Sequence, residues 1–187
     1  MCQRIIAASD STIAVEVFEA GLLRKRKLIL FFDDFSGELF HSPECPGQSR
    51  LALKVDARSV ECREPSLSKA KRHAITTYAR DVALAAGQHP EILFQSTYMK
   101  EKPLRGFVMN GQLTVRGVTR PVRANLDIGP MKQHRVQIDA DASIRLNDLG
   151  IEAPSAWLGL TRVRNEAMIH VLLWTDSGGH VTLPATQ

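Results

Sequence analysis

The chain has few cysteines, few aromatic residues and no long apolar run. Its 187 residues include three cysteines, and aromatic residues make up 6%. Three cysteines without motif spacing argue against a disulfide framework, although a Cys45–Cys62 pair is conceivable. The run Leu28–Phe32 is far shorter than the roughly 20 residues that a membrane-spanning helix needs. We therefore expect neither a disulfide-stapled miniprotein nor a transmembrane helix.

Sequence signatures of catalysis and metal binding are also missing. No two of the six histidines lie two or four residues apart, and there is no Cys-x-x-Cys, Gly-x-Ser-x-Gly or glycine-rich phosphate loop. Asp33 and Asp34 are adjacent on a predicted strand and point to opposite faces, so they cannot share a proton. His170 is expected to be a hydrogen-bonded core residue, and His89 a turn contact. We expect no catalytic residue, metal or cofactor.

The charge of the chain is modest, at +4. Much of the local excess lies in the basic run Arg24–Lys27, which has no interleaved aromatic residues, so a nucleic-acid partner is not expected. At most, this run or the cluster Lys69–Arg72 would make peripheral contact with an anionic membrane. The first 17 residues contain no apolar segment of secretory-signal length, so we expect a cytoplasmic protein with reduced cysteines.

What the sequence does contain is period-two alternation, typical of half-buried strands. It runs through 51–58, 107–115, 122–128 and 136–145, and strands are also predicted over Thr12–Phe18, Leu28–Phe40 (bent at Asp33-Asp34 and Gly37) and Ala167–Trp174. Gly117 lies at a tight corner between two strands, where a positive φ is expected. Pro121 removes a ladder donor and suits a strand start or edge.

One segment departs from this pattern. Over Ser66–Ala86, apolar residues recur at helical spacing, a serine can cap the start, and Gly87 follows as a stop, which predicts one helix, unbroken or interrupted. A short turn or helix is expected over Ile151–Trp157 and a loose tail over His180–Gln187. No linker or repeat divides the chain, so residues 1–187 are expected to form a single domain.

The most distinctive residues are His89-Pro90, Ile92-x-Phe94-x-Ser96-Thr97 and Gly111-x-Leu113-Thr114-x-x-Gly117-Val118-Thr119-x-Pro121-Val122. This block resembles the polyisoprenoid-binding, YceI-like family, with weaker matches at Phe35-Ser36-Gly37 and 145–151. The resemblance covers a core of roughly residues 11–174. It implies an all-β fold, a single antiparallel lipocalin-like β-barrel of about eight strands with one inserted helix, whose interior holds a long isoprenoid chain. The family's insert is acidic, whereas Lys69–His73 is basic here.

The inward faces of such a barrel supply the candidate ligand-binding residues. They are Val15, Val17, Leu53, Val55, Phe94, Ser96, Phe107, Met109, Leu113, Leu126, Ile138 and Ala140. This aliphatic set can bury an isoprenoid tail at about 25 cal/mol per Å², before the costs of association. It can also simply fill a closed core. The Ser96 hydroxyl would bond a ligand headgroup, a buried water or a neighbouring carbonyl.

We therefore predict a binding protein for a long-chain isoprenoid lipid of the quinone or polyprenyl phosphate type. It would act as a carrier or store, without chemistry on the ligand, and a homodimer is compatible with the sequence. One alternative is an enzyme that uses the cavity for acid–base work on an apolar substrate, and a pair of titratable groups converging on the cavity would favour it. Another is a filled barrel that binds a protein partner through its helix.

Overall fold

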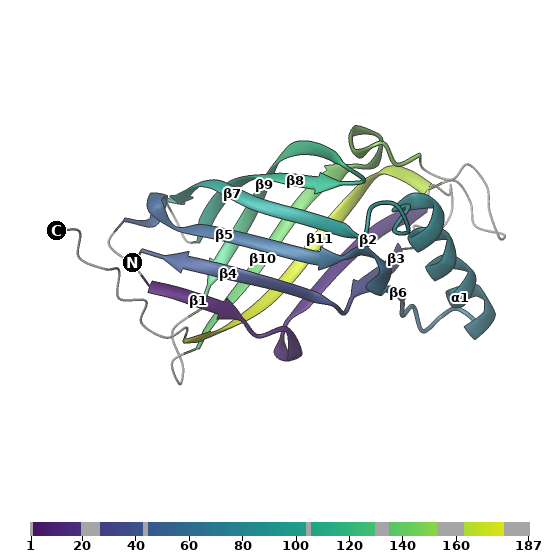
Figure 1. Ribbon diagram of the computed structural model, residues 1–187, viewed down its shortest axis with the longest axis horizontal. Helices are drawn as coiled ribbons and strands as arrows, with labels where there is room; N and C mark the ends of the chain where they lie inside the picture. The colour runs from purple at the N-terminus through teal and green to yellow at the C-terminus, as the bar shows by residue number, and fades with distance from the viewer. Residues whose placement is uncertain are drawn as a thin grey trace.

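The computed structural model describes residues 2–19, 27–42, 45–103, 106–129, 135–152 and 163–177. Within them the chain forms one antiparallel sheet that curls into a barrel (Figure 1). The strands are β1 Cys2–Ile6, β2 Thr12–Glu19, β3 Lys27–Phe32, β4 Phe35–His41, β5 Arg50–Asp56, β6 Val60–Cys62, β7 Glu91–Glu101, β8 Phe107–Val115, β9 Val118–Ile128, β10 Val136–Arg145 and β11 Val163–Ser177. The order β1-β4-β5-β7-β8-β9-β10-β11 closes through pairing of β1 with β11, which confirms the predicted eight-stranded antiparallel barrel.

Three further strands, β2, β3 and β6, continue the wall beyond this ring. The long strand β11 pairs with β2 along 167–172 and with β1 along 175–177. Asp33 and Asp34, both exposed, separate β3 from β4, so the single bent strand expected over Leu28–Phe40 is two strands with different neighbours. Among the described residues β6 pairs with β3 alone, whereas β5 pairs with β7. The wall therefore splits between β6 and β7 at one end.

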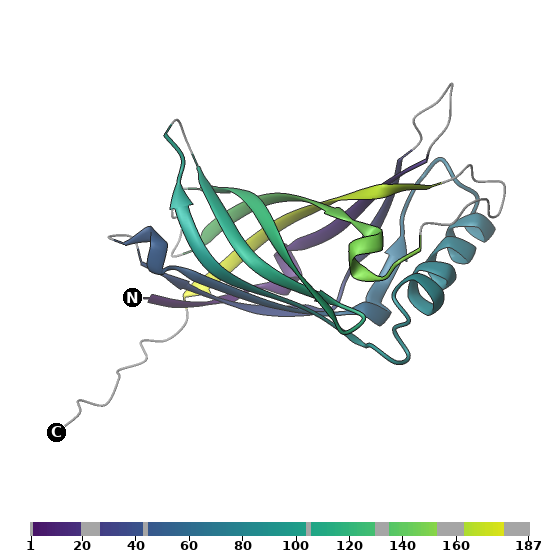
Figure 2. The ribbon, with the colours of Figure 1, turned by 90° about the horizontal axis from the view of Figure 1, so that it is seen from above.

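The inserted helix lies at this split end (Figures 1 and 2). Helix α1 spans Lys69–Tyr78, and the Ser68 hydroxyl caps it by accepting a hydrogen bond from the Lys71 N–H at 3.3 Å. Its buried residue Ile75 packs with Leu28, Cys62 and Leu67.

The helix is shorter than the predicted Ser66–Ala86. After Tyr78 the chain enters a π-type turn over Ala79–Ala83, in which the N–H groups of Leu84 and Ala86 bond the carbonyls of Ala79 and Arg80. Ala85 then adopts a positive φ of 48°, and its carbonyl accepts hydrogen bonds from Gln88 and His89. These bonds redirect the backbone toward β7 and end the helical segment before Gly87.

The interior differs between the two ends of the barrel. Away from the helix it is filled by residues that we call the floor: Met99, Met109, Leu126, Val136, Ile138 and Leu173, each at most 6% exposed. At the helix end a second cluster contains Leu113, Val115, Leu146, Leu149, Ile151, Val163 and Ala167. Leu146–Leu149 form a short 3-10 turn between β10 and β11.

The corner between β8 and β9 is a two-residue hairpin turn. Arg116 and Gly117 have φ values of +53° and +73°, so the predicted positive φ of Gly117 is confirmed. Two consecutive positive φ values are typical of a type I′ turn, which matches the twist of the flanking strands.

Other expectations are refined by the structure. Strands β1 and β6 were not predicted, and β11 extends beyond the predicted Ala167–Trp174 at both ends. Cys45 and Cys62 are free thiols. Residues 24–26, most of the turn predicted over Ile151–Trp157 and the tail 180–187 lie outside the described residues.

Candidate functional site

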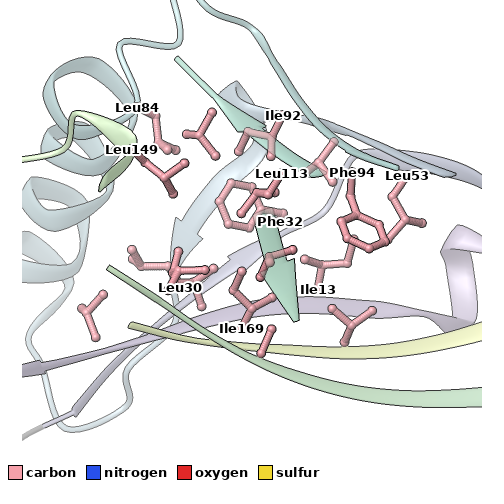
Figure 3. Close-up of a pocket in the computed structure, with 18 of the residues that line it drawn as sticks. Ile13, Leu30, Phe32, Leu53, Leu84, Ile92, Phe94, Leu113, Leu149 and Ile169 are labelled. Atoms are coloured by element: carbon pink, nitrogen blue, oxygen red, sulfur yellow. The ribbon is translucent and has the colours of Figure 1, made fainter. Parts of the chain in front are cut away.

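A cavity of about 240 Å³ lies inside the barrel between the floor and the helix end (Figure 3). This volume is just below the usual range of ligand pockets, about 300–1,000 Å³. The lining is almost wholly apolar and comes from nearly every side of the barrel. It includes Ile13, Val15, Val17, Leu30, Phe32, Leu53, Val55, Leu84, Ile92, Phe94, Met109, Leu113, Leu126, Ile138, Leu149 and Ile169.

The lining contains three residues that are not apolar: Tyr78, Asp141 and Glu152. Within the described part of the chain, no lysine, arginine, histidine, serine, threonine or amide side chain reaches it. Asp141 turns its carboxylate outward, where Oδ1 lies 2.5 Å from His170 Nδ1. An anionic group placed deep in this cavity would find no cationic side chain among the described residues to compensate its loss of hydration. The site is therefore suited to an apolar ligand or to the apolar part of an amphipathic one.

Ten of the twelve predicted inward-facing residues line this cavity. They are Val15, Val17, Leu53, Val55, Phe94, Met109, Leu113, Leu126, Ile138 and Ala140. Phe107 and Ser96 are not part of the lining. Phe107 packs against the core beside Leu126, its cross-strand partner, at the floor end.

Ser96 is buried within the wall and is not among the residues that line the cavity. The ladder between β5 and β7 ends at the pair Ala52–Gln95, and the β7–β8 register shifts between Ser96 and Tyr98. The N–H of Leu51 therefore lacks a ladder partner, and it donates to Ser96 Oγ at 2.8 Å. The hydroxyl completes the hydrogen bonding of the wall.

Several lining residues were missed from the sequence. Leu30 and Phe32 alternate with Ile29 and Phe31, which are also apolar, so their parity carried no signal. Leu146 and Leu149 were detectable, because their spacing of three before Gly150 is typical of a short helical turn with a glycine stop. Gly150 has a φ of +71°.

In the described part of the chain, two segments next to Ile75 and Tyr78 of α1 cover the cavity at the helix end. We call them the cover segments: Ala79–Ala86 and Leu146–Ile151. Leu84 from the first and Leu149 from the second point into the cavity (Figure 3). Arg116, in the β8–β9 turn, lies between them. Its Nη1 donates to the Ala83 carbonyl at 3.2 Å and to the Gly150 carbonyl at 2.9 Å. One side chain thus ties together both segments that close this end.

His170 lies on the outer surface of the barrel and not in the core, with 43% of its side chain exposed. Its Nδ1 faces Asp141, and its Nε2 lies 3.2 Å from Glu16 Oε2, while Glu16 Oε1 lies 3.3 Å from Lys27 Nζ. His170 is hydrogen-bonded, as expected, but its side chain lies on the outer face of the barrel instead of in the core. In the described ranges no three histidine, cysteine or carboxylate side chains are grouped to hold a metal ion.

A closed antiparallel barrel with an apolar interior cavity defines the lipocalin-like class of small-ligand-binding barrels. Within that class, residues 5–173 match the family described as YceI-like domain, and the chain belongs to this family. Among the described residues, no helix is both long and apolar enough to cross a membrane.

Relatives and solved structures agree with this assignment. A UPF0312 protein of Pectobacterium carotovorum is 26% identical over 125 residues, which cover 64% of this chain and 61% of the relative. A UPF0312 protein of Pseudomonas putida is 27% identical over 130 residues, which cover 67% of this chain and 64% of the relative. The chain thus spans less than two thirds of the length of these relatives.

The same fold occurs in several solved structures, among them the following three. Burkholderia cenocepacia BcnA superposes with a TM-score of 0.72 at 15% identity, covering 90% of this chain and 98% of that one. A polyisoprenoid-binding domain from Saccharophagus degradans, implicated in plant cell wall breakdown, gives 0.67 at 12% identity, covering 95% and 99%. The YCEI protein of Campylobacter jejuni gives 0.62 at 14% identity, covering 84% and 89%.

Proposed function

We propose that this chain binds a long-chain isoprenoid lipid, with the tail in the barrel cavity, and carries or stores it without altering it. The observation that carries this proposal is the interior cavity, lined by aliphatic and aromatic side chains from most of the wall. Membership of the YceI-like family and the fold shared with a polyisoprenoid-binding domain support the same ligand class.

The chemistry of the lining matches an isoprenoid tail. Branched methyl groups of the ligand would contact branched side chains such as Val55, Ile92 and Leu113, and each Å² removed from water contributes about 25 cal/mol before association costs. A quinone or phosphate headgroup would lie at the mouth, because no cationic side chain among the described residues lines the cavity. Tail burial would supply the affinity, and the headgroup would remain near water.

The first experiment is native mass spectrometry after mild purification, followed by extraction and identification of any retained lipid. A co-purified prenyl lipid is the expected result. Wild-type protein that carries no lipid and fails to bind added geranylgeraniol would contradict the proposal.

A matched pair of variants places the tail. Leu113→Trp puts an indole into the cavity, whereas Gln112→Trp puts the same group on the outer face of β8, where residue 112 is exposed. We expect the first to abolish geranylgeraniol binding and the second to leave it unchanged. Overpacking costs ~1–3 kcal/mol, so melting temperatures are compared first, and Val55→Trp serves as a second cavity variant. Equal binding by folded Leu113→Trp and Val55→Trp would show that the tail lies elsewhere.

A further inference from the structure

The two ends of the barrel differ in how they are closed. At the floor, Met99 and Met109 are cross-strand partners, each 1% exposed, within the continuous hydrogen-bonded ring. At the helix end the wall splits between β6 and β7, and the cover segments close the cavity in place of strands. Opening the floor would require separation of paired strands, whereas the described residues that cover the helix end, the cover segments and α1, can move without breaking a strand pair.

The backbone of the first cover segment is irregular where it meets the cavity. Ala79–Ala83 form a π-type turn, and Ala85 follows with a φ of 48°. π-type turns are frequent at functional sites, and a non-glycine residue at positive φ persists only where its surroundings hold it. Within this turn Val82 is 55% exposed, whereas Ala79 and Ala86 at the two ends of the segment are 5% and 1% exposed.

Arg116 binds this segment through a hydrogen bond to the Ala83 carbonyl. Its guanidinium bonds one carbonyl on each cover segment. The type I′ turn fixes the backbone of Arg116 relative to β8 and β9, which belong to the ring. The contact therefore links two movable segments to a rigid part of the wall.

We propose that ligand enters and leaves through the helix end and that Arg116 is the latch that holds this end shut. When the bonds to Ala83 and Gly150 break, the cover segments separate and carry Leu84 and Leu149 away from the cavity. Arg116 is a positioning residue, since it touches neither the cavity nor the tail. This inference rests on the proposed function, because the cavity must be the ligand site.

The decisive measurement is the rate of exchange of a neutral apolar probe, N-phenyl-1-naphthylamine, by stopped-flow fluorescence. Arg116→Met removes both hydrogen bonds and keeps an unbranched side chain, and we expect uptake and release to accelerate together by roughly ten-fold, with the Kd changed less than about three-fold. Arg116→Lys, which can restore one bond, should give intermediate rates. Arg123→Met, on the exposed face of β9, is the matched control and should exchange like wild type.

The outcomes distinguish a failure of the proposed role of Arg116 from a failure of the lipid assignment. If geranylgeraniol does not bind but probe exchange depends on Arg116, the lipid assignment is wrong and the latch stands. If geranylgeraniol binds wild-type protein and both rates are unchanged in Arg116→Met, the latch is wrong. Weaker binding that arises only from faster release would identify Arg116 as a ligand contact and would also overturn the proposal.

Hydrogen exchange tests the same contact without any ligand. In Arg116→Met, amides of the cover segments should exchange several-fold faster, while those of β7 and β10 keep the wild-type rates. Unchanged exchange in both cover segments would overturn the latch, even if the probe does not bind.

Discussion

The Ser96 hydroxyl lies 2.8 Å from the backbone nitrogen of Leu51 and satisfies it where the β5–β7 ladder ends. Ser96→Ala would leave a buried N–H without a partner, which costs about 1–3 kcal/mol. We expect this loss in urea denaturation, with ligand affinity retained. Thr97→Ala is the control, because Thr97 is exposed and its hydroxyl donates at 3.2 Å to the Asn110 carbonyl. Loss of lipid binding by folded Ser96→Ala would assign the hydroxyl to the ligand instead.

We expect that replacement of Gly117 by a residue with a side chain destabilises the protein because of the backbone conformation alone. A Cβ there would meet His89 at an ordinary 3.7 Å, so space is available, but φ is +73°. Gly117→Val should therefore cost more than about 1 kcal/mol through strain. Gly87→Val is the matched control, since a Cβ at residue 87 meets nothing within 4 Å and no positive φ occurs there. Equal melting temperatures for the two variants would show that the turn tolerates a branched residue.

Burial raises the pKa of the Cys62 thiol above its ordinary value, because the thiolate would lose its hydration beneath helix α1. The fraction of nucleophilic thiolate is therefore reduced in the folded protein. We expect iodoacetamide at pH 8 to alkylate exposed Cys45 well before Cys62, as read by peptide mass spectrometry. Denatured protein, in which both sites should react at similar rates, is the control. Rapid labelling of Cys62 in folded protein would contradict its burial.

The raised pKa of the Cys62 thiol also determines how the stability of the fold depends on pH. Since the folded thiol titrates above the unfolded one, its contribution is complete below the unfolded pKa, near 9, and is lost as the pH rises through the folded pKa. Cys62→Ala should therefore show a flatter dependence of unfolding free energy on pH above about 9 than wild type does. Parallel curves would indicate that the thiol titrates alike in both states.

Membrane contact is expected to be weak and electrostatic. Lys69, Lys71 and His73 are exposed on α1, the helix at one end of the barrel. Each charged side chain near an anionic bilayer contributes about 1 kcal/mol, screened within a Debye length of about 8–10 Å. We expect sedimentation with phosphatidylserine-containing vesicles at low salt and release at high salt, with reduced binding in Lys69→Gln/Lys71→Gln. Binding that survives high salt would indicate an apolar anchor instead.

Alternation along the sequence predicted most of the strands and ten of the residues that line the cavity, because a period of two fixes which residues share a face. The closed barrel itself was implied by the resemblance to the YceI-like family. Alternation did not reveal the role of Ser96: parity places it inward, but only the register shift in β7 shows which backbone group it serves. Leu30 and Phe32 escaped because both faces of β3 are apolar. Parity also could not place His170, whose strand is apolar on both faces.

Contacts between distant segments were beyond the reach of local patterns. Arg116 looks like an ordinary exposed turn residue in sequence, and its two acceptors come from segments far away along the chain. The early end of α1 has a similar cause. Alanine-rich residues up to Ala86 favour helix, but the π-type turn and the backbone of Ala85 interrupt it where the chain must join β7.

The floor limits the length of the lipid tail that the proposed site could hold. A tail that entered at the helix end, as proposed, would meet Met109, Ile138 and Leu173 after a fixed depth, whatever headgroup remained outside. Methionine side chains are flexible and tolerate replacement, so shortening Met109 lowers the floor without changing the mouth. On the proposed function, selection among lipids of different length would depend on a few residues at the far end of the barrel, separate from those proposed to govern access.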